Sequence, residues 1–182
     1  LQRMKRVGRY LIGRPRVGCL FAWQKGEHNI KVLSDSDWAA DKTPRKSVSG
    51  GVIMNGNHLI KSWAKKQSVV ATSSAEAELH GANKAATEGL GVKAYLEDLG
   101  VTRAVRLHLD SSAALSLIGR TGLGKAKHIE IQHLWLQEAI ARGRLTAEKV
   151  STDINPADIG TKHLTGSRVD LLMDLMRCHY LE

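Results

Sequence analysis

The chain has 182 residues with 42% hydrophobic content, which is enough for one packed domain, and its formal charge of +9 points to polyanionic partners. No run of about 18 uninterrupted apolar residues occurs, which excludes a helical membrane span. The basic start lacks the apolar stretch and cleavage site of a secretory signal, which excludes that class of leader.

The positive charge is concentrated at the N-terminus. Residues 1–25 hold seven of the 27 lysines and arginines and no acid, which leaves 20 basic residues against 18 acidic ones in the remainder. This asymmetry predicts a basic arm that binds a polyanion such as nucleic acid, with a solvated surface helix as the alternative. Cys19 and Cys178 stand outside any metal-binding spacing, so we expect an intracellular, reduced protein. The start at Leu1, not Met, leads us to expect a fragment of a longer polypeptide.

Periodicity and turn residues predict the order of elements along the chain. The predicted elements are a helix over 3–12, strands over 17–23, 30–34, 48–54 and 58–63, a helix over 73–99, a strand over 105–109, helices over 112–118 and 129–140, a strand over 145–150, and helices over 156–162 and 169–176. Asn55-Gly56-Asn57 is a strong hairpin turn signal. Strands, a long helix, a strand, further helices and a last strand are typical of a mixed-sheet α/β fold.

Four acidic residues lie where a predicted strand ends or a predicted helix begins. Asp35 follows the strand over 30–34, Asp110 follows the strand over 105–109, Glu78 lies early in the long helix, and Asp158 follows the last strand. A site that holds two divalent ions about 4 Å apart at a phosphate needs such carboxylates from distant parts of the chain. Taken singly, each acid is also explained as a turn cap, a first-turn helix acid or a helix N-cap.

Six short motifs occur in order between about Leu33 and Leu164, and together they resemble the ribonuclease H domain of copia-type (Ty1/copia) retrotransposon polyproteins. The motifs are Ser34-Asp-Ser-Asp-Trp-Ala39, Arg45-Lys-Ser-Val-Ser-Gly50, Ser62-Trp-Ala-Lys-Lys-Gln67, Ser73-Ser-Ala-Glu-Ala-Glu78, Lys127-His-Ile-Glu130 and Ala157-Asp-Ile-Gly-Thr-Lys162. The basic segment Arg6-Val-Gly-Arg-Tyr-Leu11 is similar to the one that follows the reverse transcriptase in those polyproteins.

The resemblance implies a ribonuclease H-like α/β fold, a five-stranded mixed sheet flanked by helices, with a basic N-terminal arm. It divides the chain into an arm over 1–28, a ribonuclease H domain over 29–164 and a C-terminal helical tail over 165–182. The implied activity is metal-dependent endonucleolytic cleavage of the RNA strand of an RNA–DNA hybrid, with two Mg²⁺ ions or, as a substitute, Mn²⁺. The implied partners are the hybrid and the reverse transcriptase domains of the same polyprotein, in a cytoplasmic virus-like particle or the nucleus.

Residue by residue, the resemblance implies that four acids are catalytic and bind the metal ions: Asp35, Glu78, Asp110 and Asp158. We prefer Asp35 to Asp37 because Asp35 comes directly after the apolar strand. The resemblance favours Glu78 over Glu76, because Glu78 stands before Leu79 and the family's glutamate stands before an apolar or aromatic residue. Side chains two positions apart point about 200° away from each other around a helix, so both glutamates cannot face the ions.

The residues expected to contact the hybrid are Lys65, Lys66, Gln67, Ser74 and Lys127. The loop over 150–156, where many ribonucleases H carry a mobile histidine, contains none, so His128 is the candidate auxiliary residue, and an anchoring role at a helix start stays open. His133 lies on an apolar helix stripe and is expected in the core. Trp63 is also expected in the core, whereas Trp38 could stack on a base or sugar.

Three other functions are considered. A structural remnant of a reverse transcriptase would bind the hybrid without cutting it. An integrase- or resolvase-like nuclease would keep the fold and act on DNA, although the order Asp, Glu, Asp, Asp favours ribonuclease H. A zinc module of His128, His133, Cys178 and His179 has a spacing that fits no common zinc site.

Overall fold

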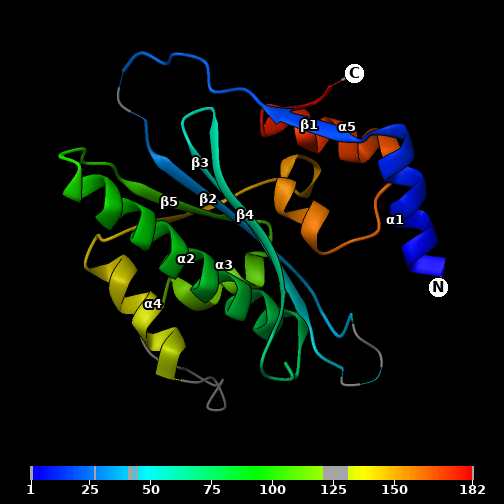
Figure 1. The fold of residues 1–182 in the computed structure, drawn as a ribbon. Coiled ribbons are helices and arrows are strands. Elements are labelled where there is room, and N and C mark those ends of the chain that lie inside the picture. The colour runs from blue at the N-terminus through cyan, green and yellow to red at the C-terminus, as the bar shows by residue number, and fades with distance from the viewer. Residues whose placement is uncertain (1, 27, 41–42, 44, 121–130, 182) are drawn as a thin grey trace.

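A computed structural model describes residues 2–26, 28–40, 43, 45–120 and 131–181 (Figure 1). A five-stranded sheet at its centre has the strand order β4-β3-β2-β5-β6. The strands are β2 (Ile30–Asp37), β3 (Val48–Asn55), β4 (His58–Lys66), β5 (Val105–Leu109) and β6 (Thr146–Lys149). The first three pair antiparallel, and β2, β5 and β6 pair parallel, which confirms the predicted mixed sheet.

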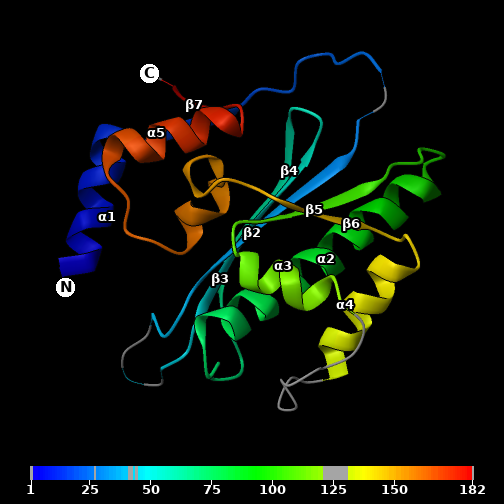
Figure 2. The same cartoon turned by 180° about the vertical axis from the view of Figure 1, so that it is seen from behind.

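Helices cover both faces of this sheet (Figures 1 and 2). One face carries α2 (Ser74–Asp98), α3 (Ser112–Ile118) and α4 (Ile131–Ala141). The other side carries the short 3-10 helices η1 (Thr152–Ile154) and η2 (Pro156–Gly160), with α5 (Gly166–Leu175) and α1 (Gln2–Gly13) beyond them. A second, two-stranded sheet joins β1 (Arg16–Cys19) to β7 (Cys178–Leu181). Among the helices of the described residues, none has the length and apolar character needed to cross a membrane.

The main core lies between the sheet and α2. Alanines on the buried face of α2 let the helix approach β2 and β5 closely, where Val32 and Leu107 are fully buried. Burial of each such aliphatic side chain stabilises the fold by about 1.5–3 kcal/mol. Trp63 packs against this core and over Gly51, where an added Cβ would lie 2.0 Å from the ring, so its predicted core position is confirmed.

Several element boundaries differ from the sequence-based prediction. β2 continues to Asp37, so Asp35 lies inside the strand and not after its end, because β3 pairs with it as far as Asp37↔Val48. The expected strand over 17–23 is shorter, at 16–19, and the expected helix over 156–162 is a 3-10 helix. The C-terminal tail is not wholly helical, because residues 178–181 pair with β1 as a strand. That pairing joins residues far apart in the chain, and local periodicity contains no signal for it.

Candidate active site

The parallel pairing of β2 and β5 brings the first two acids together. Ser34 lies opposite Leu109 in the register, so the next residues along the two strands, Asp35 and Asp110, meet at the same edge of the sheet. The Asp35 side chain is 1% exposed. Asp110 is partly buried, and its Oδ2 accepts a hydrogen bond of 3.1 Å from the Thr152 hydroxyl.

The η2 segment brings Asp158 to the same edge. The Asn155 side chain fixes this segment, since its amide donates to the Ser34 carbonyl at 3.0 Å and its oxygen accepts from the Ala157 N–H at 3.2 Å. Gly50 is required below it, because an added Cβ would lie 2.5 Å from the Ala157 carbonyl oxygen. The result is one acidic cluster.

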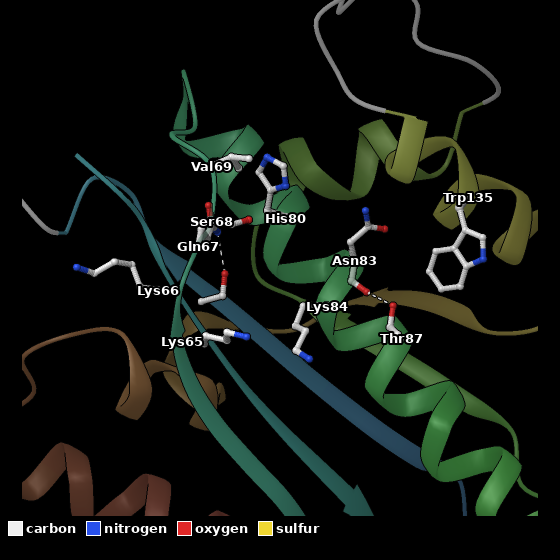
Figure 3. A pocket seen from close by; sticks show the side chains of 11 residues that line it. Lys65, Lys66, Gln67, Ser68, Val69, His80, Asn83, Lys84, Thr87 and Trp135 are labelled. Atoms are coloured by element: carbon white, nitrogen blue, oxygen red, sulfur yellow. Dashed lines mark hydrogen bonds between the residues drawn. The ribbon is translucent and has the colours of Figure 1, made fainter. Parts of the chain in front are cut away.

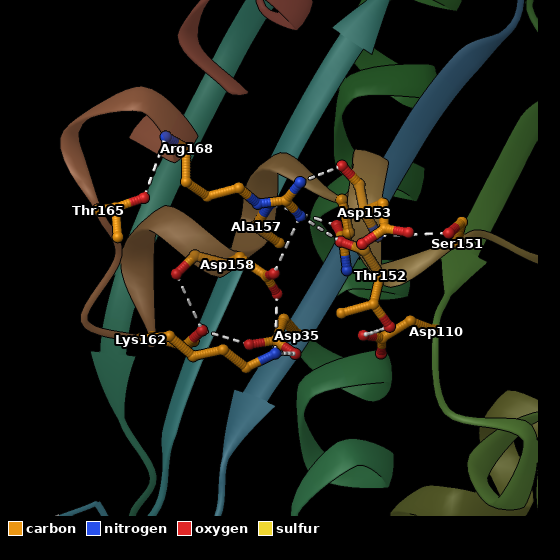
Figure 4. Close-up of polar contacts among 12 residues, drawn as sticks. Asp35, Asp110, Ser151, Thr152, Asp153, Ala157, Asp158, Lys162, Thr165 and Arg168 are labelled. Carbon is orange, nitrogen blue, oxygen red and sulfur yellow. Dashed lines mark hydrogen bonds and ion pairs between the residues drawn. The ribbon is translucent and has the colours of Figure 1, made fainter. Parts of the chain in front are cut away.

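One carboxylate oxygen from each of Asp35, Asp110 and Asp158 lies within 4.8 Å of the other two (Figure 4). These three acids come from a strand, a strand end and a 3-10 helix that are 48 or more residues apart in the sequence. Within the described ranges, no other group of three His, Cys, Asp or Glu side chains comes as close. The zinc alternative is therefore unsupported for His133, Cys178 and His179, and His128 lies outside the described residues.

The two glutamates at the start of α2, Glu76 and Glu78, have different roles. Ser73 caps the helix by accepting from the Glu76 N–H at 3.2 Å, and Glu76 returns to accept from the Thr72 N–H at 2.6 Å. This reciprocal arrangement is a capping interaction that occupies the Glu76 carboxylate. Ser74, expected to contact substrate, is exposed in the first turn of α2.

Glu78 faces the sheet beside the acidic cluster. Burial, together with the charges of Asp35 and Asp110, raises the pKa of Glu78 to about 8, although the Ser36 backbone N–H donates to its carboxylate and opposes this shift. Its Oε2 is buried without a hydrogen-bond partner. An unsatisfied buried carboxylate oxygen next to two further acids is the environment that a divalent cation would relieve.

A lysine that the sequence analysis did not single out holds the cluster together. The Lys162 ammonium donates to Asp35 Oδ1 and to Asp158 Oδ1, each at 2.9 Å (Figure 4). Burial alone would lower the pKa of Lys162, but these two hydrogen bonds outweigh it and raise the pKa above its ordinary value. Burial nevertheless raises the pKa of Asp158, and the nearby Asp35 charge adds to it, because several carboxyls share one ammonium.

Two signals in the sequence point to Lys162. It stands four residues after Asp158, and it ends the motif Ala157–Lys162. The neighbouring Thr161 hydroxyl also donates to Asp35, and the Arg168 guanidinium lies 3.7 Å from Asp158 Oδ2. The site is thus acidic at its centre and partly neutralised from the side of η2 and α5.

A groove of about 520 Å³ lies between the end of β4 and the face of α2 (Figure 3). Its lysines come from β4 and from α2, and Trp135 of α4 lies at the far side. The residues lining it are Ser49, Lys65, Lys66, Gln67, Ser68, Val69, His80, Asn83, Lys84, Thr87 and Trp135. Three of the five residues predicted to bind substrate, Lys65, Lys66 and Gln67, therefore share one surface.

The Gln67 side chain also has a structural role. The Gln67 amide is buried and donates to the Ser49 hydroxyl at 2.7 Å and to the Ala77 carbonyl at 2.8 Å, so it links β3 to α2.

Two other predicted residues, Lys127 and His128, fall within 121–130, outside the described residues. His133 is 2% exposed and contacts Asn83, which confirms its core position, and burial lowers its pKa to about 4.

The raised pKa of Glu78 predicts a pH-dependent stability. Between about 4.5 and about 8 the folded chain holds a proton on Glu78 that the unfolded chain has released, so stability falls as pH rises through this window. We expect Glu78 to contribute a fall of about 3 kcal/mol in the free energy of unfolding of the ion-free protein between about pH 5 and about pH 8. This contribution is the difference between the native chain and Glu78→Gln, because the lowered pKa of His133 gives both proteins an opposite slope below about pH 6.5. Urea unfolding across this range, for the native chain and Glu78→Gln, measures the slope.

Glu78→Gln should remove most of this slope, because the amide does not titrate. Glu76→Gln is the matched control: it weakens the cap of α2, so it should lower stability at every pH and leave the slope unchanged. Equal slopes in the native chain and Glu78→Gln would contradict the assignment of the raised pKa to Glu78.

Solved structures identify the class of this fold. The N-terminal ribonuclease H domain of Rv2228c from Mycobacterium tuberculosis matches with a TM-score of 0.50 at 18% identity, covering 81% of this chain and 98% of that one. LC11-RNase H1, isolated from compost by a metagenomic approach, matches with a TM-score of 0.50 at 19% identity, covering 74% and 93%. The chain has a ribonuclease H-like fold, as its motifs predict.

Curated relatives place this fold in a longer protein. The chain is 33% identical over 168 residues to the retrovirus-related Pol polyprotein from transposon RE1 of Arabidopsis thaliana, covering 91% of this chain and 11% of the relative. It is 29% identical over 180 residues to that from transposon TNT 1-94 of Nicotiana tabacum, covering 98% and 13%. No protein-family profile matches the chain. The chain is homologous to one segment of the retrovirus-related Pol polyproteins of copia-type transposons, and it spans little more than a tenth of the length of these relatives.

Proposed function

We propose that the chain is a metal-dependent endonuclease that cleaves the RNA strand of RNA–DNA hybrids during reverse transcription of a copia-type retroelement. The observation that carries the proposal is the meeting of Asp35, Asp110 and Asp158 within 4.8 Å, from three separate elements of a ribonuclease H-like fold. Glu78 beside them supplies the fourth acid in the order Asp, Glu, Asp, Asp.

The residues fit divalent cations. Every candidate metal ligand is a carboxylate oxygen, the type of ligand that Mg²⁺ prefers, and Mn²⁺ binds the same type of ligand. The ammonium of Lys162 offsets only part of the charge of these acids, and the Glu78 Oε2 is buried without a hydrogen-bond partner, so the site can accept further positive charge. Asp35, Glu78, Asp110 and Asp158 would hold these ions, with Asp35 as the acid nearest the centre of the site. When bound, two such ions activate a water for attack on phosphorus and stabilise the leaving oxygen.

The chain's own residues orient the carboxylates. The Thr161 hydroxyl donates a hydrogen bond to Asp35, and the Thr152 hydroxyl donates one to Asp110. These hydrogen bonds fix the orientation of each carboxylate. In the ion-free site Lys162 holds Asp35 and Asp158 close together, because its ammonium lies between their carboxylates and offsets their mutual repulsion. Such preorganisation lowers the cost of arranging the site at the moment of reaction.

The groove between β4 and α2 supports binding of the hybrid. Lys65 and Lys66 project from the end of β4, and Lys84 projects from α2, so the groove walls carry positive charge suited to phosphates (Figure 3). We propose that a strand of the hybrid follows this groove toward the acids, with Ser74 and Lys127 as further contacts. Selection of RNA over DNA would depend on contacts with 2′ hydroxyls.

The polyprotein relatives support the wider context. We propose that the chain works with the reverse transcriptase domains of the same polyprotein, inside the cell, in a cytoplasmic virus-like particle or the nucleus. We propose the division into an arm over 1–28, a ribonuclease H domain over 29–164 and a tail over 165–182. His128 is proposed as an auxiliary residue.

The test is cleavage of a labelled RNA–DNA hybrid with and without Mg²⁺, for the native chain and for Asp110→Asn. We expect Mg²⁺-dependent cutting of the RNA strand, reduced by about a thousandfold or more in Asp110→Asn, since removal of a metal ligand raises the barrier by several kcal/mol. The affinity of Asp110→Asn for the hybrid, measured in the presence of Ca²⁺, should stay within a few-fold of that of the native chain.

Two outcomes would contradict the proposal. Binding of the hybrid without cutting, unchanged in Asp110→Asn, would identify a structural remnant. Cutting of double-stranded DNA in preference to the hybrid would identify an integrase-like nuclease on the same fold.

A further inference from the structure

The two cysteines of the chain, 159 residues apart, meet in the small sheet formed by β1 and β7. Cys19 lies directly opposite Cys178 in the antiparallel register, and their Sγ atoms are 2.8 Å apart. That separation exceeds the length of a disulfide bond by only about 0.8 Å. The proton-bearing thiols thus already lie close to bonding geometry.

The hydrogen bonding of the strands also suits a cross-link. The Leu20 N–H donates to the Arg177 carbonyl at 2.9 Å, which is one of the bonds that flank a non-hydrogen-bonded pair, while the Arg177 N–H donates to the Asp174 carbonyl at 2.8 Å. Cys19 and Cys178, one position along, are therefore the non-hydrogen-bonded pair, in which Cα atoms lie about 4.5 Å apart. A disulfide accepts Cα separations from about 4.4 to 6.8 Å, so the backbone does not need to move.

Neighbouring contacts hold this register. Arg14, just before β1, forms an ion pair with Asp170 of α5 and lies 4.0 Å from the centre of the Tyr180 ring. The Tyr10 hydroxyl of α1 lies 3.0 Å from the Tyr180 hydroxyl. These contacts dock the basic arm on the C-terminal tail (Figures 1 and 2), so the two thiols do not meet by chance fluctuation of free ends.

We propose that Cys19 and Cys178 are a reversible oxidation site whose disulfide locks the N-terminal arm to the C-terminal strand. With glutathione disulfide as oxidant, the Cys19 thiolate attacks one of its sulfurs and releases a first glutathione thiolate. Cys178 then loses its proton and attacks Cys19 Sγ, which releases the second. The two protein thiols are oxidised by two electrons, and one glutathione disulfide becomes two glutathione molecules that take up the two protons.

The exposures of the two thiols set this order. Cys19 is exposed and open to the oxidant, whereas Cys178 is 3% exposed. Burial, reinforced by the contact with Cys19, raises the pKa of Cys178 to about 12, so this thiol is a poor first nucleophile at neutral pH. In a reducing compartment both cysteines remain thiols, and oxidation links the arm covalently to β7.

The test is equilibration of the chain in buffers of stepped glutathione to glutathione disulfide ratio, followed by acid quenching and alkylation. We expect monomers that lose both free thiols together, and a non-reducing peptide map that joins the Cys19 peptide to the Cys178 peptide. The oxidised chain should have a Tm higher by about 5–10 °C, because the bond closes a very long loop. Neither change depends on nuclease activity.

Cys19→Ser is the matched control, since this exposed position tolerates the change and leaves Cys178 in its native place. It should show no Tm difference between oxidised and reduced buffers. Glutathione attached to Cys19 alone, disulfide-linked dimers, or a linked chain whose Tm is unchanged would each overturn the proposal.

Discussion

Replacing Asp35 with asparagine should reduce hybrid cleavage by about a thousandfold or more and leave the fold intact. Asp35 is the most central acid of the cluster, since it lies beside Asp110 in the sheet and shares Lys162 with Asp158. The amide keeps the shape of the side chain but loses the charge that would hold the ions. The measurement is the initial rate of RNA-strand cleavage at saturating hybrid and Mg²⁺, with the circular dichroism spectrum as a check on folding.

Asp37→Asn provides a matched control on the same strand. Asp37 lies two residues further along β2, at its end, and is not one of the three acids that meet. Its substitution should change the cleavage rate by less than about threefold, since it removes no ligand. Equal loss of activity in both variants would show that the assignment of Asp35 as the ligand is wrong.

Replacing Lys162 with methionine should weaken the ion-free protein and strengthen its affinity for divalent ions. The ammonium offsets the charges of Asp35 and Asp158, which are both buried, so its removal takes this partner from Asp35 and leaves Asp158 with Arg168 at 3.7 Å. Because the Lys162 side chain is itself 36% exposed, we expect a loss of about 2 kcal/mol in the free energy of unfolding, below the cost of breaking a fully buried pair. Chemical denaturation in EDTA measures it.

The same substitution removes a competing positive charge from the acidic cluster. We expect Mn²⁺ to bind Lys162→Met about tenfold more tightly than the native chain, as measured by calorimetry, and saturating Mn²⁺ to restore most of the lost stability. Lys61→Met is the control, because Lys61 pairs with Glu88 at the surface and its loss should cost less than about 1 kcal/mol. Unchanged Mn²⁺ affinity in Lys162→Met would show that the Lys162 ammonium does not compete with the ion for the carboxylates.

Local patterns and short motifs in the sequence are enough to predict the fold class and the candidate acids. The hairpin turn at Asn55-Gly56, the long alanine-rich helix and the strand over 105–109 are local patterns, and each appears in the structure within a few residues of its predicted position. The preference for Glu78 over Glu76 rests on the residue that follows it, Leu79, and on helical geometry, which allows only one of the two to face the ions, and both signals are local. Ser73 caps α2 as its residue type predicts, because its hydroxyl satisfies a backbone N–H at the helix start.

The contacts between these elements depend on the three-dimensional fold. The pairing of Ser34 with Leu109 and the docking of η2 on Gly50 set the distances between the acids, and neither is encoded in a local pattern. Lys162 acquires its role only when Asp35 and Asp158 approach it from distant parts of the chain. The pairing of Cys19 with Cys178 likewise arises because the two ends of the chain form one sheet, and the free energy of such contacts depends on the whole fold.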